Sequence, residues 1–118
     1  VAASRDLGER GIAWLRNGLG DHPNVGEIRG RGLLMAVEFV SDRTTKLPFD
    51  RSQQVAERVV AAAFDRRLTA YPCSSAVDGN VGDAVLLGPP LCVTADELRT
   101  MIERLVDAVR AVLPPATD

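Results

Sequence analysis

The sequence predicts an α+β domain in which a small, mostly antiparallel sheet is covered by helices on one face. Its 118 residues suffice for one domain with a single hydrophobic core. Three segments carry apolar residues at helical spacing, and four short apolar runs are typical of strands. Their order is helix, strand, strand, helix, strand, strand, helix. A sheet that buries one face against the helices satisfies all of these patterns.

The first half of the chain supplies one helix and two strands. Residues 3–19 have a moderately amphipathic helical pattern, which Gly and Pro end within residues 20–24. Residues 25–28 predict a brief strand that two glycines then interrupt. Residues 33–40 predict a stronger strand, and their almost continuous apolar character indicates burial on both faces for much of its length. The polar residues 41–50 predict a loop.

The second half begins with another helix. Asp50 stands at an N-cap position with Gln53 three residues later, so we expect a helix that runs to about Arg67. Residues 68–71 then predict a strand that ends at Pro72, because proline cannot donate to a ladder.

The final segment contains the clearest element of the sequence. Residues 73–83 predict a loop, and residues 84–87 predict a last strand that ends before Pro89-Pro90. Thr94 is the expected cap of the closing helix, and Glu97 completes a capping box. The apolar stripe of this helix consists of Leu98, Met101, Ile102, Leu105, Val109 and Val112.

Composition and charge exclude several classes of function. A net charge of −2 provides no electrostatic basis for binding nucleic acid or an anionic membrane. No apolar run approaches the ~20 residues that cross a bilayer, and no cationic leader is recognisable. The two cysteines are too few for a disulfide framework, so we expect a cytoplasmic protein with reduced thiols. Because Val1 enters a helical pattern almost at once, we also expect the sequence to be a piece of a longer one.

The segment Gly30-Arg31-Gly32 is the first candidate for a binding loop. Glycines let backbone N–H groups approach a phosphate. A dinucleotide-binding fingerprint, however, needs a third glycine at the position where this sequence has Met35. It also needs a helix after the glycines, where this sequence predicts a strand. We expect instead a turn that permits close packing or a positive φ. Arg29 and Arg31 either bind a carboxylate or, as the favoured alternative, have a simple surface role.

The individually reactive residues form no complete catalytic group. His22 is the only histidine, so a metal site is not expected, and we expect it to be an ordinary surface residue. Cys73 has no identifiable base, and Cys92 is expected to pack as a small hydrophobic residue. No residue is predicted to be catalytic or to bind a metal or cofactor.

Several segments taken together resemble the C-terminal domain of class III, omega-type, aminotransferases. They cover nearly the whole chain in the order found in that family: the helix of residues 3–19, V-G-E-I-R-G-R-G-L-L at residues 25–34, Glu38, Thr45-Lys46 with Pro48-Phe49, residues 68–72, G-D-A-V-L-L-G-P-P-L at residues 82–91, and the closing helix. The resemblance implies the C-terminal domain of a fold-type I enzyme that uses pyridoxal 5'-phosphate and works as a homodimer.

The resemblance also implies what this chain lacks. In the family, a lysine and an aspartate of a larger domain hold the cofactor, and neither motif occurs in this sequence. Lys46, the only lysine, lies in a T-K-x-P-F loop instead. We therefore expect residues 1–118 to be a single small domain whose residues 1–22 connect to a missing large domain. Alone, it should bind no cofactor and be inactive.

One position bears on the substrate. Family members that act on ornithine-like substrates have an arginine before the paired prolines, which grips the substrate carboxylate, and this sequence has Leu86 there. Other members have a mobile arginine shortly before the Gly-Asp pair, where residues 78–81 read Asp-Gly-Asn-Val. We expect Leu86 to form part of the substrate-pocket wall. The parent enzyme should prefer an amine, or bind its carboxylate with a residue of the missing domain.

Two functional interpretations remain open from the sequence. The leading one is part of an aminotransferase that moves an amino group from an amine or amino acid to a keto acid or aldehyde, with this domain contributing pocket wall and interdomain or dimer contacts. The alternative is a free-standing binding or interaction module without catalysis. A severed domain should expose an apolar face, and residues 3–19 are the expected surface.

Overall fold

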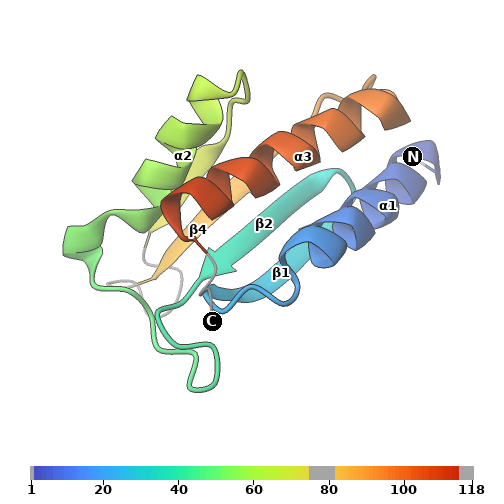
Figure 1. Cartoon of the computed structure of the whole chain (residues 1–118). Helices are drawn as coiled ribbons and strands as arrows, with labels where there is room; N and C mark the ends of the chain where they lie inside the picture. The colour runs from blue at the N-terminus through green and yellow to red at the C-terminus, as the bar shows by residue number, and fades with distance from the viewer. Residues whose placement is uncertain (1, 75–81, 115–118) are drawn as a thin grey trace.

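The computed structural model describes residues 2–74 and 82–114, with side chains described from residue 5 to 73 and from 82 onward. The predicted order of elements is confirmed (Figure 1). The elements are α1 (Ala2–Leu19), β1 (Val25–Arg31), β2 (Leu34–Phe39), a 3-10 turn η1 (Arg51–Gln53), α2 (Val55–Asp65), β3 (Tyr71–Ser74), β4 (Asp83–Leu87) and α3 (Ala95–Val112).

The four strands form one antiparallel sheet in the order β1-β2-β4-β3. Side chains alternate between its faces, and those that point toward the helices are deeply buried: Met35, Val37, Phe39, Val85 and Leu87. The three helices lie together on that side (Figure 1). The predicted α+β architecture with helices on one face of an antiparallel sheet is therefore confirmed.

The first helix belongs to the core. Leu15 and Leu19 of α1 are fully buried, because α1 packs against α3 and β1. Trp14 is half-buried beside α3, where the guanidinium carbons of Arg10 and Arg99 lie 5.3 and 5.9 Å from the centre of its ring. The expectation that residues 3–19 form an exposed apolar surface was wrong, since the rest of the domain supplies their partners.

The second helix begins later and ends earlier than predicted. Asp50 accepts a hydrogen bond from the Ser52 N–H and caps only η1. Gln54 then adopts a left-handed conformation (φ 48°, ψ 49°), and α2 begins at Val55. The expected capping box with Gln53 and the extension to Arg67 were wrong. Arg67 lies beyond the helix with φ 64°.

The edge strand β3 begins where the predicted strand of residues 68–71 was expected to end. It continues through Pro72, which pairs with Val85 of β4. Proline is tolerated in an edge strand because every second backbone N–H of such a strand faces away from the sheet and has no partner strand. Leu68 and Ala70 are buried on the approach to this strand.

His22 and Cys92 differ from their predictions. His22 is 5% exposed, and its Nε2 lies 2.6 Å from the Leu113 carbonyl oxygen at the end of α3. Its Nδ1 accepts a hydrogen bond from the Asn24 N–H at 3.0 Å, so Nε2 is the donor to Leu113. The ring thus ties the turn after α1 to the end of α3, whereas Cys92 is exposed rather than packed.

Candidate functional site

The helix-free face of the sheet carries Leu86, the one residue that the sequence placed in a substrate pocket. Leu86 of β4 pairs with Ala36 of β2 and Tyr71 of β3, and Ala36 pairs in turn with Arg29 of β1. Directly paired residues share a face, so these four side chains form one row across the sheet. Because Val85 and Leu87 point into the core, Leu86 points away from the helices.

A shallow depression of about 250 Å³ lies on this face beside Leu86. Ala36 contributes only a methyl group to it, while Leu34 and Leu86 are apolar neighbours and Arg29 and Arg31 are basic ones. Leu34 remains 53% exposed, and Tyr71, farther along the row, remains 56% exposed. The depression therefore combines an apolar surface with two arginines at its rim.

The Gly30-Arg31-Gly32 segment ends β1 and enters the turn of residues 32–33 that leads to β2, beside this depression. A Cβ atom at Gly30 would lie 2.7 Å from Cδ1 of Ile12 on α1, and Gly32 has φ +59°. Both predicted reasons for glycine, close packing and a positive φ, are confirmed. The strand was predicted to stop at residue 28, but β1 continues to Arg31 because Gly30 and Arg31 pair with β2.

The two arginines of this rim have different partners. Arg29 lies 3.4 Å from a carboxylate oxygen of Glu27 and 3.5 Å from one of Glu38. Among the described residues, no carboxylate lies within ion-pair distance of Arg31. Arg29 is thus held by neighbours on the same face, whereas the guanidinium of Arg31 remains available.

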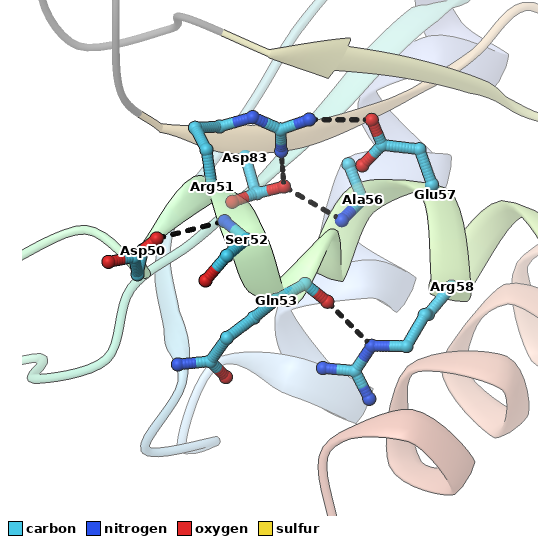
Figure 2. Close-up of polar contacts among 8 residues, drawn as sticks. All are labelled: Asp50, Arg51, Ser52, Gln53, Ala56, Glu57, Arg58 and Asp83. Carbon is cyan, nitrogen blue, oxygen red and sulfur yellow. Dashed lines mark hydrogen bonds and ion pairs between the residues drawn. The ribbon is translucent and has the colours of Figure 1, made fainter.

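A polar cluster fixes the β4 strand that carries Leu86 (Figure 2). Asp83, at the start of β4, is fully buried and forms an ion pair with Arg51 of η1. The same Asp83 oxygen accepts a hydrogen bond from the Ala56 N–H at 2.9 Å, so a residue of β4 caps the N-terminus of α2. Arg51 also donates to Glu57 at 2.6 Å. The cluster joins η1, α2 and β4.

Ion pairing shifts the pKa values of two members of this cluster, Arg51 and Glu57. The hydrogen bond from Arg51 lowers the pKa of Glu57 below its usual range, and the same bond raises the pKa of Arg51. The role of Asp83 as a cap was not predicted from the sequence. The only signal for it is an acidic residue at the start of an otherwise apolar strand, and that position does not reveal which helix lies opposite.

The described residues do not fit pyridoxal 5'-phosphate. Lys46 lies in an exposed loop and donates to the Gly26 carbonyl oxygen, and it does not line the depression beside Leu86. Within the same part of the chain, no group of three or more His, Cys, Asp or Glu side chains could hold a metal ion. None of the described helices is long and apolar enough to cross a membrane. Residues 78–81, where some relatives were expected to have an arginine, lie outside the described residues.

Comparisons with known proteins give a consistent result, although no family model matches the chain. An uncharacterized aminotransferase of Bacillus subtilis is 38% identical over 88 residues, which cover 75% of this chain and 20% of the relative. A transaminase obtained by ancestral reconstruction has a solved structure that matches with a TM-score of 0.82 and 36% identity. The chain belongs to the aminotransferase family. The resemblance found in its sequence is thereby confirmed.

The structural matches cover most of this chain but only a small part of the length of each relative. The reconstructed transaminase is matched over 92% of this chain and 22% of its own. An (S)-enantioselective omega-transaminase of Thermomicrobium roseum matches with a TM-score of 0.80 and 28% identity, over 93% of this chain and 23% of its own. The chain thus spans about a fifth of the length of the relatives it matches.

Proposed function

We propose that this chain is the C-terminal small domain of a class III aminotransferase that uses pyridoxal 5'-phosphate. The whole enzyme transfers an amino group from an amine or amino acid to a keto acid or aldehyde. The observation that carries this proposal is the match of almost the entire chain to a fifth of several aminotransferases. A free-standing module is less well supported, because those relatives are about four times as long.

In this proposal, the helix-free sheet face is the surface that meets the rest of the enzyme. It bears Leu34 and Tyr71, two of the large apolar residues left exposed by the described part of the chain. The missing large domain supplies the cofactor lysine, and a second copy of the enzyme completes a cytoplasmic homodimer. The 118-residue chain alone is inactive, because the cofactor lysine belongs to the missing large domain.

Leu86 forms part of the substrate-pocket wall. An aliphatic side chain at this position cannot form the paired hydrogen bonds by which an arginine binds a carboxylate. The parent enzyme therefore prefers uncharged amine donors to α-amino acids, unless a residue of the large domain binds the carboxylate.

Substitution in the whole enzyme tests both the domain assignment and the role of Leu86. Leu86→Arg should raise kcat/KM for α-amino acids relative to simple amines, because it introduces a carboxylate partner. Leu91→Arg is the matched control, since Leu91 is 82% exposed and does not line the depression. Equal effects of the two substitutions would contradict a pocket role for Leu86, and a whole protein without amino transfer would contradict the proposed function.

A further inference from the structure

The strand β1 has a free edge at one end of the sheet. In the order β1-β2-β4-β3, β2 is the only described strand beside it. Arg31 and Leu34 pair on either side of a two-residue turn, so every second residue from Arg31 back to Glu27 directs its backbone groups toward β2. The intervening residues, Ile28 and Gly30, direct their N–H and C=O groups away from the sheet. Such a row of outward backbone groups is a template for an additional strand.

Two cationic side chains cover the outward carbonyl groups of this edge. Arg16 of α1 donates from Nη2 to the Ile28 carbonyl oxygen at 3.3 Å. Lys46, in the loop after β2, donates to the Gly26 carbonyl oxygen. Within the described part of the chain, no carboxylate lies within ion-pair distance of either cation. A strand that added to β1 would have to displace both side chains from the backbone.

The course of β1 and the opposite edge of the sheet also disfavour strand addition. The register between β1 and β2 shifts between Val25 and Glu27, so Gly26 lies at a bulge that interrupts the edge. At the other end of the sheet, Pro72 of β3 has no N–H to donate to a further strand. Charged side chains, bulges and prolines are the features by which proteins prevent edge-to-edge pairing. Both edges of this sheet therefore carry such features.

We propose that Arg16 and Lys46 prevent β1 from pairing with β1 of a second copy of this chain. The partner that they exclude is a second copy, because an edge strand is complementary to itself in the antiparallel orientation. With Ile28 near a two-fold axis, the N–H of each copy meets the C=O of the other. The edge is accessible, since a groove of about 280 Å³ is lined by residues 25–28 and by Arg16.

This role accounts for the position of the only lysine of the chain. Lys46 adopts φ 60°, which is uncommon for a residue with a side chain, at the place from which its amine reaches β1. The proposed aminotransferase function does not use Lys46, and the blocking of this edge requires no catalysis. Covering a sheet edge and transferring an amino group are thus separate properties of the protein.

Removal of both donors from the 118-residue chain tests the proposal. The double variant Arg16→Ala/Lys46→Ala should associate as its concentration is raised, with a mass in analytical ultracentrifugation that approaches twice the 12.7 kDa of the monomer. The parent chain should remain monomeric over the same range. The loss of two positive charges changes the net charge from −2 to −4, so association would occur against an increased repulsion between copies.

Amide hydrogen exchange locates the contact between the copies. When about nine in ten molecules of the double variant are paired, the N–H groups of Ile28 and Gly30 should exchange about tenfold more slowly, since exchange then occurs from the unpaired tenth. The Arg29 N–H is the internal reference, because Arg29 already pairs with Ala36 of β2. Its exchange rate should change less than those of its two neighbours.

The matched control is the double variant Arg58→Ala/Arg67→Ala. Arg58, like Arg16, is an exposed helical arginine that donates to a backbone carbonyl, that of Gln53 at 2.9 Å. Arg67, like Lys46, is an exposed cation with a positive φ, 64°. This control loses the same charge on and after α2, which packs against α3, β3 and β4, and it should remain monomeric. Circular dichroism verifies that each variant is folded.

The single variants Arg16→Ala and Lys46→Ala extend the test to the case in which the double variant does not fold. Each frees one carbonyl group and should associate more than the parent chain. Concentration-dependent pairing with protection of Ile28 and Gly30, absent from the control, supports the proposal. Folded variants that remain monomeric, association without protection at these two residues, or equal association of the control would overturn it. None of these measurements depends on amino transfer by the whole protein.

Discussion

Replacing Asp83 by Ala should destabilise the domain by roughly 2 to 3 kcal/mol. Asp83 is fully buried and serves two partners at once, the guanidinium of Arg51 and the Ala56 N–H. Loss of an N-cap side chain costs about 1 kcal/mol. Breaking a buried ion pair costs about 3 to 5 kcal/mol, but Arg51 is 27% exposed and keeps Glu57 as a partner, so only part of this cost applies.

Urea denaturation followed by circular dichroism measures this loss. Asp83→Asn retains an oxygen that can accept from the Ala56 N–H and removes only the charge, so it should destabilise less than Asp83→Ala. Asp65→Asn is the matched control, because Asp65 is an exposed acidic residue at the end of α2, and it should change stability by less than about 0.5 kcal/mol. If Asp83→Ala were as mild as Asp65→Asn, Asp83 would not hold α2 and β4 together.

Three further predictions concern stability. Because Arg51 lowers the pKa of Glu57 in the folded state, the stabilisation from this ion pair is fully present above the unfolded pKa of Glu57, near 4.5, and is lost as the pH falls through the folded pKa. The free energy of unfolding, measured as a function of acid pH, should show this decrease in stability, and the decrease should be smaller in Arg51→Gln. His22→Ala should cost about 1 to 3 kcal/mol in urea denaturation by leaving the Leu113 carbonyl without its buried partner, and a change below 0.5 kcal/mol would contradict that role. Arg67→Gly should raise stability by up to about 1 kcal/mol, because glycine adopts φ 64° without steric cost; a lower melting temperature would contradict this.

The order of the elements was predictable because it depends on local pattern. The apolar run of β2 indicated a buried strand, and the stripe of α3 indicated which residues of that helix face the core. The capping box of Thr94 and Glu97 was also predictable, since both partners lie within one turn, and the structure contains both of its hydrogen bonds. The turn that begins at Gly32 was predicted for the same reason.

The errors arose where a distant residue determines the local structure. The α2 cap comes from Asp83, which is 27 residues from Ala56, so the nearer Asp50 gave a misleading signal. His22 is buried by a contact with Leu113, which lies 91 residues away. Pro72 can continue β3 only because that strand is at the sheet edge, and edge position follows from topology. The row on the helix-free face, including Arg29 and Leu86, likewise depends on a register that sequence spacing alone does not determine.

The most direct test compares the 118-residue chain with the whole protein encoded by its gene. Both would be purified with pyridoxal 5'-phosphate, dialysed to remove unbound cofactor, and assayed by mass spectrometry for transfer of a labelled amino group from an amine to a keto acid. We expect the whole protein to retain the cofactor and transfer the amino group, and the chain alone to do neither. Amino transfer by the isolated chain, or a whole protein that retains no cofactor, would contradict it.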